Sequence, residues 1–218
     1  MSKTVAVLGG TGNEGPGLAL RWAKSGRYKV IVGSRQLEKA ERVASELNAK
    51  LGQNLIEGKV NEEAAAAADV CVLTVPYSAH EATLAGLRSA LQGKVLVDVT
   101  VPLKPPKVSQ VHVPAGGSAG QEAQAVLGDG VRVVAAFQNV GMAHLAEGDS
   151  HIDCDVLVCG DDKAAKQEAI QLAQAAGMRG IDAGPLQNAV VAEGLTSVLI
   201  GINIRYKCKG AGIKITGI

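Results

Sequence analysis

The sequence predicts an α/β fold, in which a doubly wound, mostly parallel sheet is followed by a small C-terminal α/β domain ending in a long helix. Two observations lead to this prediction. Strand and helix patterns alternate along most of the 218 residues, as in successive βαβ units. Hydrophobic residues make up 47% of the chain although only 2% are aromatic, so the core must consist of Ala, Val, Leu and Ile. Such a composition suits Val-rich parallel strands covered by Ala-rich helices.

Composition also excludes several classes of protein. The 22 Lys and Arg residues balance the 21 Asp and Glu residues, which argues against a dedicated nucleic-acid or membrane-surface binder. The scarcity of aromatic residues argues against an antibody-like sandwich and against modules that stack on RNA bases. The four cysteines lack CxxC spacing, so we expect reduced thiols and no metal site. With no secretory signal and a C-terminal apolar stretch (198–204) too short for a membrane span, we expect a cytoplasmic protein.

The N-terminal third shows four regular elements in order. Residues 4–8 are apolar and run into glycines, which predicts the first strand. Residues 18–24 carry apolar side chains at helical spacing, and 28–32 form a second apolar run. A helix is predicted over 36–50, because Leu37, Ala40 and Val43 share one face.

The middle of the chain continues the alternation. A short strand at 55–58 precedes a helix at 64–68, for which Asn61 is the predicted N-cap. The apolar run 70–75 predicts a buried strand, which Pro76 ends. A helix at 79–91 and a strand at 94–99 follow.

Regularity stops between Thr100 and Gly120, where prolines and glycines predict a long loop. Loops of this length inside compact domains are usually functional. A helix at 121–127 and a strand at 131–137 come next. After Asp149 the pattern restarts with a strand at 156–159, a helix at 162–176, a strand at 180–183 and a final helix at about 188–206. Asp161 and Asp162 are interpreted as an N-cap and its neighbour rather than a metal pair.

The first turn of the chain carries a candidate phosphate site. Gly10-Thr11-Gly12-Asn13-Glu14-Gly15 has the G-x-G-x-x-G spacing, follows a predicted strand and opens a predicted helix. In that context Gly10 permits the tight turn, Gly12 lets a pyrophosphate approach the backbone, and Gly15 lets the helix pack on the strand. The helix N-terminus then faces the anion. This motif predicts a Rossmann dinucleotide site.

The end of the second strand indicates which dinucleotide binds. NAD-binding proteins place an Asp or Glu there to bind the ribose 2′-hydroxyl. This chain instead has Ser34 and Arg35, with Lys39 one turn further on. A hydroxyl, a guanidinium and an ammonium group suit a 2′-phosphate, so the pattern favours NADP, although Arg35 and Lys39 also fit a merely solvated helix start.

With these motifs the sequence resembles the NADPH-dependent reductases of coenzyme F420 (F420H2:NADP oxidoreductases). The resemblance runs nearly end to end, through the segments 7–13, 32–35, 72–77, 159–162, 182–186 and 203–216. The N-terminal motifs are shared by many Rossmann enzymes. The Ala183-Gly184-Pro185-Leu186 segment and the tail are much more specific.

The resemblance implies direct hydride transfer between NADP(H) and coenzyme F420 as second substrate. It implies an NADP-binding Rossmann domain over 1–150 and a small C-terminal domain over 151–218 that completes the deazaflavin cleft. We also expect a homodimer or higher homo-oligomer, with no nucleic-acid, membrane or metal partner. No acid–base residue is expected, since aligning two rings suffices for hydride transfer.

The resemblance also assigns binding residues. Those expected to bind the cofactor are Gly10, Thr11, Gly12, Asn13, Glu14, Ser34, Arg35, Lys39, Val75, Pro76, Tyr77, Ala136, Gln138, Asn139 and Val140. Those expected to bind the second substrate are Val101, Phe137, Tyr206 and Lys207. The cationic tail that includes Lys207 fits an anionic substrate equally as well as a helix C-terminus that favours cations.

One departure concerns the strand end at 136–140. Relatives usually have a His there, whereas this chain has Gln138 and Asn139, which hydrogen-bond but do not titrate near pH 7. The four histidines of the chain are scattered, and each is predicted to lie on the surface. Two alternatives stay open: a Rossmann reductase of a flavin, an imine or a small hydroxy acid, and a non-catalytic NADP-sensing regulator.

Overall fold

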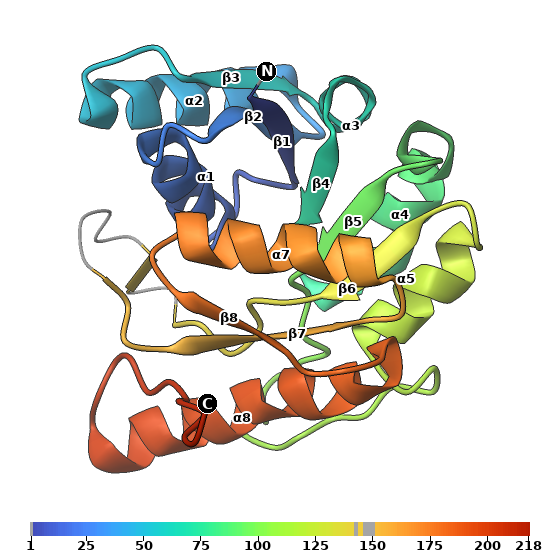
Figure 1. Cartoon of the computed structure of the whole chain (residues 1–218), viewed down its shortest axis with the longest axis vertical. Coiled ribbons are helices and arrows are strands. Elements are labelled where there is room, and N and C mark those ends of the chain that lie inside the picture. Colours follow the sequence, from blue (N-terminus) through green and yellow to red (C-terminus); the bar gives the residue numbers. More distant parts are fainter. Residues whose placement is uncertain (1, 142–143, 146–150) are drawn as a thin grey trace.

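A computed structural model of the chain describes residues 2–141, 144–145 and 151–218. Within them, eight strands form one sheet in the order β3-β2-β1-β4-β5-β6-β7-β8 (Figure 1). The strands are β1 (Lys3–Leu8), β2 (Tyr28–Ser34), β3 (Ile56–Val60), β4 (Val70–Leu73), β5 (Val95–Asp98), β6 (Arg132–Ala135), β7 (Asp155–Gly160) and β8 (Arg179–Asp182).

The sheet confirms the predicted doubly wound fold. Strands β1 to β6 are parallel, in the order typical of dinucleotide-binding folds. Strand β7 then pairs antiparallel with β6, and β8 pairs parallel with β7. Because β7 and β8 extend the same sheet, the division into 1–150 and 151–218 stays a prediction.

Helices cover both faces of the sheet. On one face lie α1 (Gly15–Lys24), α2 (Leu37–Leu51) and α7 (Lys163–Ala175), and on the other α3 (Asn61–Ala67), α4 (Tyr77–Leu91), α5 (Ala119–Leu127), the 3₁₀ turn η1 (Leu186–Asn188) and α8 (Ala189–Tyr206). The alternation along β1 explains this arrangement. Val5 and Val7 join the first core, whereas Ala6 and Leu8 join the second, and all four are fully buried. A strand buried on both faces must be apolar throughout.

Several boundaries differ from the prediction, and three of them lie close to the strand ends. Helix α3 begins at Asn61 itself, with Val60 as the N-cap, so the prediction of Asn61 as a capping residue was wrong. The predicted strands 70–75 and 131–137 end earlier, at Leu73 and Ala135. The second shortening has a visible cause, because Phe137 adopts a positive φ of 74° that no strand continues through.

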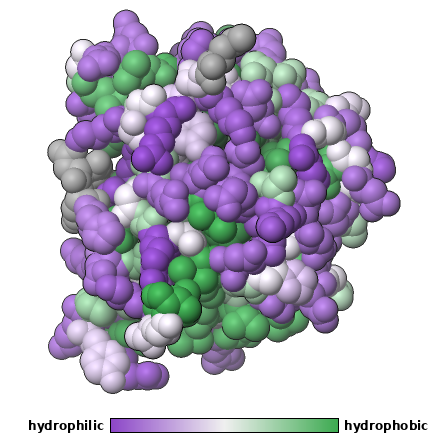
Figure 2. All heavy atoms as spheres, in the orientation of Figure 1, coloured by the Kyte–Doolittle hydropathy of each residue, from purple (hydrophilic) through white to green (hydrophobic). Residues whose placement is uncertain are grey.

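Helix α8 is apolar over most of its length. The segment Leu186–Tyr206 is, among the described residues, the one helix long and apolar enough to cross a membrane. The core helix of a soluble protein passes the same test, so this is weak evidence. Here α8 packs on α5, β7 and η1. Its outer side leaves Val191, Val198 and Ile204 exposed, and Figure 2 shows hydrophobic surface gathered over this part of the molecule.

Candidate functional site

The glycine-rich turn after β1 has the geometry of a phosphate cradle. The Gly10 N–H donates to the carbonyl oxygens of Val7 (3.1 Å) and Gly33 (2.9 Å), which fastens the turn between β1 and β2. A Cβ at Gly10 would lie 2.6 Å from the Val7 oxygen, and one at Gly15 would lie 2.5 Å from the Gly10 Cα. At Gly12 the nearest atoms are 3.7 Å away. Packing thus requires glycine at 10 and 15, whereas bare backbone at Gly12 leaves room for a ligand.

The start of α1 leaves its N-terminus open toward this cradle. Glu14 is the N-cap, but its side chain makes no capping hydrogen bond, and a proline follows in the first turn. The helix N–H groups therefore remain suited to an anion. Desolvation raises the pKa of Glu14 from 4.5 to about 7. Thr11 is half-buried beside it, while Asn13 is exposed.

Asn61 supports the cradle and was missed as a site residue. Its Oδ1 accepts the Gly9 N–H at 3.0 Å. A Cβ at Gly33 would approach the same oxygen to 2.7 Å. Asn61 therefore holds the glycine turn beside the end of β2. Nothing in the sequence pattern around Asn61 signals this contact, since Asn before a helix is equally typical of a cap.

The end of β2 places the three predicted 2′-phosphate ligands together. Ser34 is buried, and its Oγ accepts the Gln36 N–H at 3.2 Å, which leaves its O–H free to donate. Arg35 and Lys39 are exposed, and neither makes an ion pair within the described part of the chain. No carboxylate belongs to β2 itself. This end of the sheet thus carries uncommitted positive charge near the cradle.

The end of β4 lies against the glycine turn. Thr74 donates both its N–H (2.9 Å) and its hydroxyl (3.1 Å) to the Leu8 carbonyl. A Cβ at Gly9 would lie 2.3 Å from Val75 Cγ1, so Val75 covers the turn directly. Pro76 is exposed and forms the N-cap of α4.

Tyr77 is engaged elsewhere. Its hydroxyl donates to Glu122 Oε2 of α5 at 2.8 Å, and burial together with this bond raises the pKa of Tyr77 to about 12. The ring lines a cavity of about 360 Å³ between α4 and α5, with Ser78, His80 and Val126. The structure therefore gives Tyr77 a partner in α5 rather than bringing its hydroxyl to the cradle.

The segment after β6 contains two buried amides with unused acceptors. Gln138 Nε2 donates to the Asp98 carbonyl at 2.8 Å, and Asn139 Nδ2 donates to the Asp155 carbonyl at 2.6 Å. Within the described residues, Gln138 Oε1 and Asn139 Oδ1 have no hydrogen-bond partner, although both residues are only 2% exposed. Buried acceptors without partners are costly and call for an explanation. Ala136 and Val140 flank them and are also buried.

Phe137 is packed inside the core. The side chain is 1% exposed and meets Trp22 edge-on, with ring centroids 5.9 Å apart. It is core, because its positive φ turns the chain and directs the ring against α1. This packing lends no support to the expected contact of Phe137 with a second substrate, which stays a prediction.

The other expected substrate residues are not brought to the cradle by any contact in the described residues. Val101 is half-buried after β5, where its carbonyl accepts the Leu103 N–H at 2.8 Å. Tyr206 is 72% exposed at the end of α8, and Lys207 adopts the left-handed conformation that ends the helix. Their predicted roles stay predictions.

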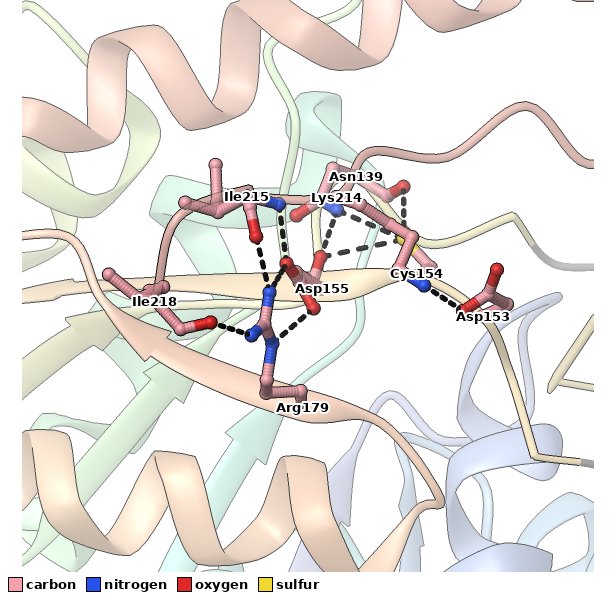
Figure 3. A network of polar contacts seen from close by, with 8 residues as sticks. All are labelled: Asn139, Asp153, Cys154, Asp155, Arg179, Lys214, Ile215 and Ile218. Atoms are coloured by element: carbon pink, nitrogen blue, oxygen red, sulfur yellow. Dashed lines mark hydrogen bonds and ion pairs between the residues drawn. The ribbon is translucent and has the colours of Figure 1, made fainter.

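The tail after α8 is fastened to β7 near Asn139 (Figure 3). The Asp155 carboxylate accepts two bonds from Arg179, at 2.9 and 2.6 Å, and one from the Ile215 N–H at 2.6 Å. Arg179 also donates to the carbonyl oxygens of Ile215 and Ile218. Because the Asp155 carbonyl accepts from Asn139, the tail and the segment after β6 share one anchor.

His80 contradicts the expectation of surface histidines. It is 2% exposed in the first turn of α4, and its Nε2 lies 2.6 Å from Asp98 Oδ2 at the end of β5. The α8 residue Glu193, also buried, accepts the Ala119 and Gly120 N–H groups of α5 at 2.8 and 3.0 Å. No signal in the sequence indicates that His80, Asp98 and Glu193 lie in neighbouring elements, since they are far apart along the chain.

The fold and the glycine cradle define a Rossmann-type dinucleotide-binding protein. Residues 4–102 match the family model described as NADP oxidoreductase coenzyme F420-dependent. The F420-dependent NADP reductase of Methanocaldococcus jannaschii is 44% identical over 222 residues, which cover 98% of this chain and 98% of that protein. That of Methanothermobacter thermautotrophicus is 42% identical over 225 residues, or 100% and 97% of the two chains.

A solved structure agrees with these relatives. It comes from Arthrobacter sp. FB24, is itself a proposed F420-dependent NADP-reductase, and superimposes with a TM-score of 0.81 at 25% identity. It covers 99% of this chain and 100% of that one. The chain belongs to the family of coenzyme F420-dependent NADP oxidoreductases.

Proposed function

We propose that this protein transfers a hydride directly between NADP(H) and coenzyme F420. The observation that carries the proposal is the pairing of a glycine cradle with Ser34, Arg35 and Lys39 at the end of β2, in a chain of this family. A cradle alone fits any dinucleotide. A strand end with a hydroxyl, followed by two cations that form no ion pair in the part of the chain that the structure describes, favours the 2′-phosphate of NADP.

The binding residues divide by what they contact. The turn of Gly10, Thr11 and Gly12, with the start of α1, suits the pyrophosphate. Gly12 presents bare backbone there, and no side chain caps the first N–H groups of α1. Val75, which packs against the glycine turn, and the next residue, Pro76, lead from the phosphates toward the nicotinamide.

The two amides after β6 suit the ring end of the site. Gln138 Oε1 and Asn139 Oδ1 are buried acceptors to which no other described residue donates, so they are suited to N–H donors of a carboxamide or of a pyrimidine edge. Holding both rings in contact and excluding water is the protein's main task in such a reaction. No acid–base residue is needed for the hydride itself.

We further propose a cytoplasmic homodimer or higher homo-oligomer. The exposed apolar side chains of α8, among them Val191 and Val198, support association through this helix. The division into an NADP-binding domain over 1–150 and a C-terminal domain over 151–218 belongs to the same proposal.

The test mixes the purified protein with NADPH and oxidised F420 and follows the visible absorbance of the deazaflavin. We expect bleaching that needs both the protein and NADPH, and much slower bleaching with NADH. Flavin, imine and small keto-acid acceptors form parallel arms. No bleaching of F420 together with turnover in one of those arms would overturn the proposal.

A further inference from the structure

A buried pair of a histidine and an aspartate lies at the strand ends that form the proposed ring site. His80 Nε2 and Asp98 Oδ2 are 2.6 Å apart, and their side chains are 2% and 0% exposed. Taking two charges out of water is costly, and a well-packed apolar pair often stabilises a fold as much or more. The position of the pair therefore needs a reason beyond stability.

Asp98 connects three strand ends. Its Oδ1 accepts the Thr100 N–H at 3.0 Å, just beyond β5. Its carbonyl accepts both the Gln138 side chain (2.8 Å) and the Ala136 N–H (3.2 Å), just beyond β6. The Thr100 hydroxyl donates to the Val75 carbonyl beyond β4 at 3.4 Å. Moving Asp98 would therefore move the residues that are proposed to face both rings.

Helix α8 reaches the same point from the other side. The Thr196 hydroxyl donates to the Gln138 carbonyl at 2.7 Å. Glu193, one turn earlier, binds the first N–H groups of α5 and acts electrostatically on both Asp98 and His80. Gln138 is thus held by its side chain to β5 and by its backbone to α8.

Charged groups from every neighbouring element face His80. Asp98 comes from β5, Glu122 from α5 and Glu193 from α8, and the Tyr77 ring lies 6.1 Å from the imidazole. Burial lowers the pKa of His80, but the Asp98 hydrogen bond and these three carboxyl groups outweigh it, so the pKa is raised. The Asp98 contact thus offsets the penalty that burial places on a protonated imidazole.

We propose that His80 and Asp98 are positioning residues for hydride transfer, which fix Gln138 and the ends of β4, β5 and β6 without touching either ring. The inference rests on the ring placement proposed above. It differs from a purely structural role because it predicts lost alignment in a protein that still folds and still binds NADPH.

The first test compares His80→Gln and Asp98→Asn with Asp182→Asn, which removes the carboxylate of the ion pair between Lys166 of α7 and Asp182 of β8. We expect kcat to fall about tenfold to a hundredfold in the first two, since small misplacements of reacting groups cost rate on that scale. Their NADPH dissociation constant should change much less than kcat, because the residues proposed to bind the phosphates are not altered. The double variant should lose no more than either single variant.

A second readout does not depend on turnover. The side-chain NH₂ resonances of Gln138, measured in the protein without substrates, should shift in His80→Gln and stay in place in Asp182→Asn. The inference is overturned if the Gln138 resonances do not move, or if kcat per folded molecule is unchanged. Failure of the wild-type protein to reduce F420 would instead count against the proposed function. The resonance measurement would still decide whether His80 and Asp98 position Gln138.

Discussion

Single residues carry the choice of nucleotide at the end of β2. Ser34 keeps its hydroxyl proton available because its oxygen serves as acceptor for Gln36. Arg35 adds a planar fork that matches phosphate geometry, and Lys39 adds a point charge one helical turn away. Removing the fork should therefore affect only the nucleotide that carries the 2′-phosphate.

Arg35→Ala should weaken NADPH binding by about tenfold to a hundredfold, which is the value of one or two charge-assisted hydrogen bonds. NADH binding should hardly change, and Ser34→Ala should act in the same direction. Titration of nucleotide fluorescence measures both constants. Lys50→Ala, an exposed cation at the far end of α2, is the matched control. An equal loss for both nucleotides would show that the 2′-phosphate assignment is wrong.

Glu14 should make nucleotide binding depend on pH. Its pKa is raised to about 7, so the side chain is neutral below that pH and becomes a carboxylate beside the phosphate cradle above it. Glu14→Gln should therefore match wild type at pH 6 and bind NADPH roughly fivefold more tightly at pH 8, the effect of one nearby charge in water. The ratio of the two dissociation constants cancels the titration of the nucleotide itself. A ratio that is constant with pH, or the same ratio in the exposed control Glu63→Gln, would contradict this assignment.

At the scale of elements, two glycines show where a helix packs directly against a strand and where it does not. A Cβ at Gly58 in β3 would lie 2.4 Å from the Glu41 nitrogen and 2.5 Å from the Ala40 carbonyl carbon, both backbone atoms of α2. Glycine therefore lets α2 pack directly on β3. Gly86, in the middle of α4, meets nothing within 4 Å.

The two glycines should respond in opposite directions. Gly58→Ala should lower the free energy of unfolding by about 1–3 kcal/mol, because backbone must shift to admit the methyl group. Gly86→Ala should raise it by about 0.5–1 kcal/mol through helix propensity alone. Urea denaturation of both variants measures the difference. Equal changes in the two would show that α2 does not rest on β3 as described.

The elements themselves were largely predictable, and the contacts between them were not. Apolar runs such as Val5–Leu8 report burial on both faces, which any parallel sheet needs, so the fold followed from local pattern. The cradle was predictable because positions that require bare backbone must be glycine, and these glycines recur at a fixed spacing in the sequence. The roles of Asn61, His80 and Phe137 depend on partners far along the chain, and their neighbours in sequence carry no trace of them.

At the scale of the whole molecule, the C-terminal tail is hydrogen-bonded to Asp155 of β7 and Arg179 of β8. Asp155 takes part through every polar group it has, with its N–H donating to Ile213, its carbonyl accepting from Asn139 and its carboxylate bound by Arg179 and Ile215. The Arg179 bond lowers the pKa of Asp155 below its ordinary 3.8. Its contribution to stability is thus present above the unfolded pKa and is lost as the pH falls through the folded value.

Asp155→Asn should lower the melting temperature at neutral pH. It should also make the melting temperature fall less steeply in acid, because no carboxylate remains at this position to be protonated. Thermal unfolding between pH 7 and pH 3 measures both effects. Asp153→Asn is the control, since Asp153 pairs with Lys214 in an exposed ion pair that should contribute little. An acid decline in Asp155→Asn as steep as in wild type would show that another group controls it.

The central position of β1 in the sheet affects the order in which parts of the protein open locally. Val5 and Val7 are paired on both sides, to β2 and to β4, and have no exposed surface. Amide hydrogens in such a strand exchange with solvent only when much of the sheet opens. The exposed Gly12 follows within a few residues of this strand. The loop proposed to bind the cofactor is thus attached directly to the strand expected to open last. Its conformation should therefore persist through local opening of other parts of the sheet during turnover.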